Sequence, residues 1–191
     1  MREVKQVKMG KMVFGDGTVR VQSMLSVPSS DRKGSVKQAV ELEKAGCEII
    51  RAAIPNEEAV GLIPAIKEAV SVPLVADIHF DYRLAIKAVE AGVDKIRINP
   101  GNIGADDRVK AVADACRRHR VPIRIGVNAG SLEKHILEKY GAPVPEALVE
   151  SALYHVSLLE RFDFDDIVIS IKSSDVQTMV AAYRLLSKRC A

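Results

Sequence analysis

The sequence has no tryptophan, and its aromatic residues, all Phe and Tyr, make up only 4% of the 191 residues. It also lacks a concentrated block of basic residues, and its formal net charge is only +3. Proteins that bind nucleic acids typically combine a basic surface with aromatic side chains on which bases stack. The composition therefore gives no support to nucleic acid as a partner.

Long apolar runs are absent as well. None approaches the roughly 18 residues that a membrane-spanning helix needs. The residues after Met1, R-E-V-K-Q-V-K, also lack the apolar centre of a signal peptide. We therefore expect a cytoplasmic protein without a membrane partner. Hydrophobic residues make up 48% of the sequence, which is enough for a chain of this length to bury a substantial core.

Cysteine is scarce and scattered. The three residues, Cys47, Cys116 and Cys190, lie far apart in the sequence, and no C-x-x-C pair occurs. An odd number of isolated cysteines predicts neither a disulfide framework nor a local metal site. Cys47 and Cys116 are most simply interpreted as small buried apolar residues.

What the sequence does contain is a regular alternation of short apolar strands and helices. After a β-hairpin predicted within residues 1–18, strands are predicted at residues 19–24, 48–53, 73–79, 94–99, 122–128 and 166–172. Helices are predicted at about 35–44, after Asn56, and at about 82–90, 105–119, 131–139, 146–161 and 175–188. Such alternation indicates an α/β protein with a parallel sheet and right-handed crossovers.

The regular repetition favours a (β/α)8 TIM-barrel type over a doubly wound sheet. No G-x-G-x-x-G follows the first strand, so a dinucleotide-binding fold has no support. A complete barrel has eight strands and typically about 250 residues, so six βα units predict an incomplete barrel. We divide the chain into a hairpin at 1–18 and a partial TIM barrel at 19–191.

Polar residues recur at every second position along these strands, so they share one face of the predicted sheet. The segments A-G-C-E-I-I-R (45–51) and A-G-V-D-K-I-R (91–97) repeat one pattern, and each ends in arginine. Because strand side chains alternate between faces, the isoleucines should face the outer helices and the polar residues the barrel interior. The predicted interior set is Arg51, Arg97, Arg124 and Lys172, with Asp77 as the main counter-charge.

Four cations around one carboxylate predict a multiply charged anion as the ligand. The planar guanidinium group binds two oxygens of a phosphate at once, and barrel active sites lie at the carboxyl ends of the strands. The alternative is a structural network in which the arginines pair with internal acids. The predicted interior offers few acids for that purpose.

Other candidates carry weaker signals. Asn128, at the end of its strand, is a plausible hydrogen-bonding partner for a ligand. Asp77 and His79 form a candidate acid–base pair, although an inward histidine at a strand end is often simply packed and hydrogen-bonded. The G-N-I-G stretch (101–104) either offers backbone amides to a phosphate or forms a tight turn. His155 and His135 lack metal-ligand spacing to each other.

Several long motifs resemble one family. V-Q-S-M, P-L-V-A-D-I-H-F-D-Y-R, K-I-R-I-N-P-G-N-I-G, I-R-I-G-V-N-A-G-S-L-E-K and the S-S-D-V after the last strand are similar to the N-terminal part of bacterial 4-hydroxy-3-methylbut-2-enyl diphosphate synthase. The resemblance covers essentially the whole chain. It implies a TIM barrel followed by a smaller [4Fe-4S] domain, in a cytoplasmic homodimer that receives electrons from a donor such as flavodoxin or ferredoxin.

The resemblance also implies a reaction and a set of binding residues. The family reductively opens and dehydroxylates 2-C-methyl-D-erythritol 2,4-cyclodiphosphate in the non-mevalonate pathway of isoprenoid biosynthesis. Arginines, an asparagine and a lysine at barrel strand ends hold the diphosphate in this family. The matching positions here are Arg51, Arg97, Arg124, Asn128 and Lys172.

The sequence departs from the family in two places. Leu25-Ser26-Val27-Pro28 replaces the usual Thr-Asn-Thr or Leu-Asn-Thr, which puts one substrate contact in doubt. The family's last two barrel strands and its cluster ligands have no counterpart here, so we expect these residues alone to be inactive. A stand-alone diphosphate-binding barrel without redox activity is the alternative. The third alternative is another phosphate-binding barrel, such as an aldolase or a relative of a pterin-binding synthase. It has little support, because a Schiff-base nucleophile is a lysine that stands alone in an apolar pocket, and we expect no such lysine at a strand end.

Overall fold

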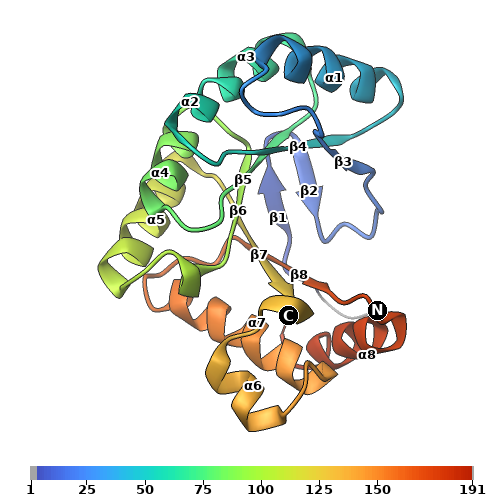
Figure 1. The fold of residues 1–191 in the computed structure, drawn as a ribbon, viewed down its shortest axis with the longest axis vertical. Coiled ribbons are helices and arrows are strands. Elements are labelled where there is room, and N and C mark those ends of the chain that lie inside the picture. The colour runs from blue at the N-terminus through green and yellow to red at the C-terminus, as the bar shows by residue number, and fades with distance from the viewer. Residues whose placement is uncertain (1–3, 191) are drawn as a thin grey trace.

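The computed structural model describes residues 4–190, and its centre is a curled parallel sheet of six strands. In order across the sheet, the strands are β3 (Gln22–Met24), β4 (Ile49–Ala53), β5 (Leu74–Asp77), β6 (Lys95–Ile98), β7 (Ile123–Asn128) and β8 (Ile167–Lys172). Neighbours in sequence are neighbours in space, which is the strand order of a barrel. Figure 1 shows them as an open arc, and within residues 4–190 β3 and β8 do not pair with each other.

Helices cover the convex side of this sheet (Figure 1). They are α1 (Arg32–Lys44), α2 (Glu57–Val60), α3 (Leu62–Ala69), α4 (Tyr82–Glu90), α5 (Asp106–His119), α6 (Lys134–Tyr140), α7 (Pro145–Glu160) and α8 (Val176–Leu186). Short 3₁₀ turns, η1 (Pro100–Asn102) and η2 (Ala129–Ser131), follow β6 and β7. The predicted βα alternation and fold class are confirmed.

Local sequence explains where several helices begin. The side chains of Asp31, Asn56, Asp81 and Asp175 each accept a hydrogen bond from a backbone N–H in the first turn of the following helix. Each of these caps satisfies a donor that has no partner within the helix. The helix predicted after Asn56 is interrupted at Gly61, and α3 then restarts with Pro64 in its first turn, where a missing N–H is tolerated.

The main core lies between the sheet and the helices. The outward isoleucines of the strands are fully buried there, including Ile50, Ile96, Ile98, Ile123 and Ile125. This confirms the predicted alternation, because the arginines of β4, β6 and β7 then face the concave side. No helix within residues 4–190 is long and apolar enough to cross a bilayer.

The predicted N-terminal hairpin is formed by β1 (Val7–Met9) and β2 (Met12–Phe14). It lies inside the arc of the sheet (Figure 1). Met9 packs there against Ile49 and Val75, with Phe14 at the margin of this second, smaller apolar cluster. The hairpin therefore closes the concave side near the amino-terminal ends of the strands. Residues 1–3 and 191 of the two predicted domains lie outside the described residues.

Candidate functional site

Two arginines share one buried carboxylate on the concave side of the sheet. Arg51 on β4 donates from Nε to Asp77 Oδ2 at 3.1 Å, and its Nη2 contacts the same oxygen. Arg97 on β6 donates from Nη1 to Asp77 Oδ1 at 3.3 Å. Asp77 lies between them on β5 and is only 1% exposed. Asp77 is thus the counter-charge of these two side chains, as the strand pattern predicts, and it orients both of them.

Arg124 adds a third guanidinium group to this cluster. It pairs in register with Arg97 on the neighbouring strand, and its Nε donates to Ser170 Oγ at 3.0 Å. Within residues 4–190 it forms no ion pair. Burial, and then the positive charge of Arg51, lower its pKa. Three guanidinium groups around one carboxylate leave an excess of positive charge, which a bound anion would neutralise.

A missing side chain creates the space for Arg97. Its Nη2 donates to the backbone oxygen of Gly126 at 3.0 Å, and the Gly126 N–H donates to Asn99 Oδ1 at 3.0 Å. A Cβ atom at position 126 would lie 2.5 Å from Nε of Arg97. The only signal of this role in the sequence is the glycine itself, because a glycine inside a strand often marks the close approach of another group.

Asn128 and Lys172 end their strands side by side. They pair in register on β7 and β8, with Asn128 half-buried and Lys172 exposed. Since all six strands are parallel, these two residues lie at the carboxyl edge, beyond the level of the three arginines. The structure thus brings Arg51, Arg97 and Arg124 together and places Asn128 and Lys172 at the rim.

His79 lies at the edge of the same cluster. Its Nε2 is 3.8 Å from Asp77 Oδ2, and its side chain is 55% exposed. Both oxygens of Asp77 already accept hydrogen bonds from arginine. Because both oxygens are engaged by arginine and His79 lies beyond hydrogen-bond distance, the geometry favours an orienting role for Asp77 over the acid–base pair with His79.

The backbone amides of the G-N-I-G stretch are used within the protein. Gly101 N–H donates to Nδ1 of His155 at 3.2 Å. The next two amides, of Asn102 and Ile103, donate to the backbone oxygens of Asn99 and Pro100. Of the two interpretations of this stretch, the structure therefore favours the tight turn.

His155 connects this turn to the loop after β7. It is fully buried on α7, and its Nε2 lies 2.6 Å from Oε1 of Glu133. Burial alone would raise the pKa of Glu133, but hydrogen bonds led by that from His155 outweigh it and lower the pKa to about 2. Because Nδ1 accepts from Gly101, the ring proton belongs on Nε2, facing Glu133. No local sequence pattern indicates this role of His155.

Lys95 is a further buried cation on the concave side of the sheet. It shares the inward parity of Arg97 but lies deeper, at the start of β6, and is 1% exposed. Its Nζ lies 4.0 Å from the ring centroid of Phe14. Lys95 does not stand alone in an apolar pocket, because Arg20 and Arg124 line the same cavity. It also sits at the amino end of its strand, away from the carboxyl edge where barrel active sites lie, so it does not contradict the expectation about a strand-end lysine.

The cysteines do not form a cofactor site. Cys47 and Cys116 are buried, and burial raises the pKa of the Cys116 thiol far above its usual range. Cys190 follows α8 in the sequence and Cys116 lies on α5, and Figure 1 shows these two helices at opposite ends of the arc. Within residues 4–190, no three His, Cys, Asp or Glu side chains are grouped to hold a metal ion. The residues present therefore do not fit the ligand set of an iron–sulfur cluster.

A curled parallel sheet with arginines inside its carboxyl end defines a TIM-barrel type protein with a candidate anion site. Residues 4–191 match the protein family described as "GcpE TIM-barrel domain", and the chain belongs to this family. The family resemblance seen in the sequence motifs is thereby confirmed.

Two relatives named 4-hydroxy-3-methylbut-2-en-1-yl diphosphate synthase (flavodoxin) show the similarity. The protein of Clostridium perfringens is 54% identical over 189 residues, which are 98% of this chain and 54% of that protein. The protein of Fusobacterium nucleatum is 54% identical over 187 residues, or 97% of this chain and 53% of that one. The chain thus spans about half the length of the curated relatives it matches.

Solved structures of low sequence identity share the fold. Dihydropteroate synthase of Yersinia pestis superimposes with a TM-score of 0.66 at 12% identity, over 96% of this chain and 70% of that one. A phospho-2-dehydro-3-deoxyheptonate aldolase of Thermotoga maritima gives 0.67 at 14%, over 97% and 52%. These likenesses support the barrel architecture alone.

Proposed function

We propose that this chain is the substrate-binding barrel part of a 4-hydroxy-3-methylbut-2-enyl diphosphate synthase. The observation that carries the proposal is the cluster of three arginines around the single carboxylate of Asp77. The names of the relatives, which are about 54% identical, support the same activity. The ligand would be 2-C-methyl-D-erythritol 2,4-cyclodiphosphate, which the whole enzyme opens and dehydroxylates reductively.

In this proposal the chain's own residues bind and orient the diphosphate. Arg51 and Arg97 are held by Asp77, so their forks lose little freedom when an anion arrives. Arg124 has no carboxylate partner among the described residues, so the bound anion would supply its only ion pair there. Asn128 and Lys172, at the rim, would contact the outer phosphate oxygens. Such preorganised donors favour a multiply charged ligand over a single carboxylate.

The redox part of the reaction needs groups other than these. The names of the relatives specify flavodoxin, which we propose as the electron donor, with ferredoxin as the alternative. When bound, a [4Fe-4S] cluster would supply two electrons that no protein side chain can supply. The cysteines of this chain do not fit its ligand set, so we derive no step through it. A cytoplasmic homodimer is part of the same proposal.

Calorimetric titration with the cyclodiphosphate tests the binding role. Arg124→Ala should weaken binding by about 1.5–3 kcal/mol, the range for a hydrogen bond to a charged group, or roughly 10- to 150-fold. Arg124 suits the test because its removal leaves no buried carboxylate without its partner. Arg117→Ala is the matched control, since Arg117 lies on the outer helix α5 and pairs with Asp114. No detectable binding, or equal losses in both variants, would argue against the proposal.

The second candidate is a diphosphate-binding barrel without redox activity. The scattered cysteines favour it for residues 4–190 taken alone. Anaerobic incubation with iron and sulfide, followed by an assay with an artificial reductant, separates the two candidates. We expect these residues to bind the cyclodiphosphate and to form no product. Product formation by residues 1–191 alone would show that they hold a working redox centre.

A further inference from the structure

A cavity of about 310 Å³ lies on the concave side of the sheet, near the amino-terminal ends of the strands. Side chains from the hairpin, the sheet and α8 line it; those that matter here are Phe14, Gln22, Lys95, Arg124, Ser170 and Tyr183. Lys95 enters from the start of β6 and Arg124 from β7. The cavity is distinct from the rim formed by Asn128 and Lys172, although Arg124 borders both regions.

Lys95 is buried in this cavity without an ionic partner. Its side chain is almost fully covered, and its Nζ faces the Phe14 ring at 4.0 Å. Within residues 4–190 it forms no ion pair. The carboxylates of Asp16 and Glu48, on the side of the cavity where Arg20 enters, contact Arg20 at 2.5 and 3.5 Å.

The remaining charged groups nearby are also occupied or cationic. Asp77, on β5, is held by Arg51 and Arg97. Tyr183, from α8, accepts the N–H of Ile171 on its hydroxyl oxygen. Burial, and then the charge of Arg124, lower the pKa of Lys95 to about 7. Near neutral pH, a large fraction of Lys95 is therefore an uncharged and nucleophilic amine.

We propose that Lys95 is a carbamylation site, at which its amine adds carbon dioxide and the new carboxylate pairs with Arg124. The lone pair of Nζ forms a bond to carbon, and one carbon–oxygen π pair moves onto oxygen. The nitrogen then releases a proton to water in the cavity, so the products are the carbamate anion and a proton. No oxidant, reductant or leaving group is needed.

The cavity has room for the carbamate, and Arg124 complements its negative charge. A carbamate adds only three heavy atoms to Nζ, and the cavity beside it accommodates them without displacing the hairpin. The reaction also gives the half-buried Arg124 an anionic neighbour in place of an amine that, when protonated, repels it.

Chemical trapping tests the proposal on the wild-type protein. The chain is equilibrated with ¹³C-labelled bicarbonate and carbon dioxide, treated with triethyloxonium to alkylate carbamates, and digested for mass spectrometry. We expect the labelled ethyl carbamate on Lys95 and none on Lys33, an exposed lysine of α1 in the same sample. Occupancy should rise as the pH increases through about 7, because only the uncharged amine reacts.

Variants identify the role of Arg124. Arg124→Gln should lower the trapped fraction at Lys95 by about fivefold or more, because the carbamate loses its cation and the amine regains a higher pKa. Arg124→Lys should retain most of it, and Arg117→Gln should leave it unchanged. Circular dichroism confirms that each variant is folded. An unlabelled Lys95 in the wild-type protein, or labelling of Lys33 to the same extent, would overturn the proposal. Noncovalent bicarbonate binding, seen as a ¹³C signal without a trapped adduct, would also overturn it.

Discussion

A methyl group at position 126 would lie 2.5 Å from Nε and 2.7 Å from Nη2 of Arg97. Arg97 is 8% exposed and has little room to move away. Gly126→Ala should therefore destabilise the fold by about 1–3 kcal/mol, the usual cost of overpacking. It should also weaken binding of the cyclodiphosphate, because the displaced guanidinium group no longer faces the ligand. Urea denaturation and calorimetry measure the two effects.

Gly130→Ala is a matched control for this substitution. Gly130 lies in η2, four residues further along the chain, and a Cβ atom there would meet no heavy atom within 4 Å. Its stability should stay within about 0.5 kcal/mol of the wild type, as for most exposed positions. Equal losses from both alanine variants would show that the effect belongs to the loss of glycine in general and not to Arg97.

The lowered pKa of Glu133 predicts how the stability of the fold depends on pH. Its pKa falls from an ordinary value near 4.5 to about 2 in the folded state, so the unfolded chain binds the proton more tightly. The stabilisation is fully present above about pH 5 and is lost as the pH falls towards about 2. Glu133→Gln should therefore flatten the acid slope of the urea midpoint in this window, while it lowers stability near neutral pH.

The control for this experiment is Glu138→Gln. Glu138 is an exposed residue of α6 that pairs with Lys134 at 3.6 Å, and an exposed pair of this kind contributes little to stability. Its acid slope should match that of the wild type. If Glu133→Gln also keeps the wild-type slope, then the contact between Glu133 and His155 does not stabilise the turn at Gly101.

The strand pattern was sufficient to predict the three arginines and Asp77 between them, but not the contacts of His155 or the burial of Lys95. Parity places Arg51, Arg97 and Arg124 on one face because a period of two is a local property of the chain. The bond from Gly101 to His155 joins residues 54 positions apart, and no local pattern marks it. The burial of Lys95 likewise depends on Phe14 in the hairpin, which the periodicity of β6 does not reveal.

At the scale of elements, the N-terminal hairpin determines the environment of Lys95. Phe14 on β2 packs beside Met9 and lies over the Lys95 amine. Phe14→Ala should cost about 2 kcal/mol, less than the range for a fully buried phenylalanine, because Phe14 is only half-buried. It should also raise the pKa of Lys95 towards its ordinary value by admitting water, which NMR titration of the lysine side-chain signals measures.

Phe80→Ala serves as the control, because the Phe80 side chain after β5 is 73% exposed. Neither stability nor the pKa of Lys95 should change appreciably in this variant. A Phe14→Ala protein of wild-type stability would mean that the hairpin packs only loosely against the sheet.

Element types were predictable, whereas some boundaries were not. The helix at residues 82–90 and the strand ends near Asn128 and Lys172 follow from caps and periodicity that act locally. The first strand was predicted from residue 19 but forms only at Gln22–Met24. As an edge strand it has a single neighbour, and Val19, which is 91% exposed, has no strand beside it to continue the ladder.

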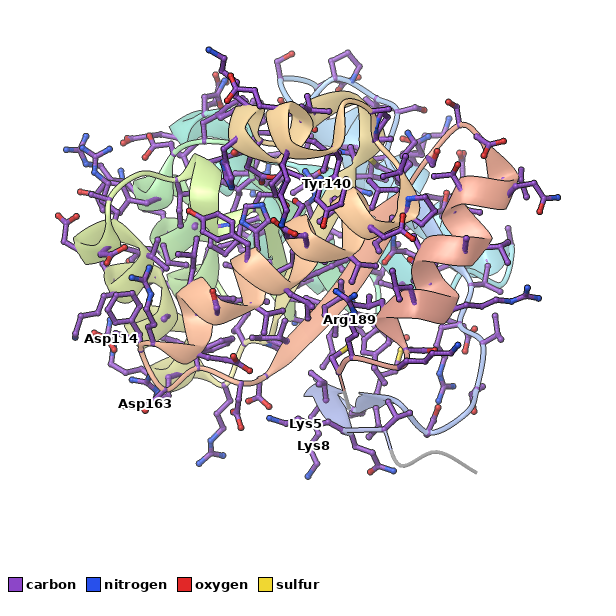
Figure 2. The ribbon with its side chains drawn as sticks, turned by 90° about the horizontal axis from the view of Figure 1, so that it is seen from below. Lys5, Lys8, Asp114, Tyr140, Asp163 and Arg189 are labelled. Carbon is purple, nitrogen blue, oxygen red and sulfur yellow. The ribbon has the colours of Figure 1, made fainter. Side chains whose placement is uncertain are left out.

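At the scale of the whole molecule, the curled sheet has two open edges within the described residues. β3 and β8 each have one neighbour, and a cavity of about 870 Å³ lies beside β8, between the hairpin and α8. In Figure 2, Lys5 marks the hairpin and Arg189 the end of the α8 segment; both residues line this cavity. Its walls include Val7, Leu153 and Leu186, so the open side is largely apolar.

Unpaired edges of this kind recruit strands from other molecules, which predicts that residues 1–191 self-associate. The β3 side is also apolar, with Val19 and Val21 exposed by 91% and 57%. Light scattering should show a mass that rises with protein concentration. Val19→Lys should reduce this rise, because a charge beside an edge strand opposes pairing and its removal from water is costly. It should leave the unfolding midpoint unchanged, since Val19 contributes little to the core.

Val180→Lys is the matched control. Val180 lies on the outer helix α8, away from β3, and is 36% exposed, so the same added charge should not reduce association through the β3 edge. A monomer that persists at millimolar concentration would mean that the hairpin and α8 already protect both edges of the sheet.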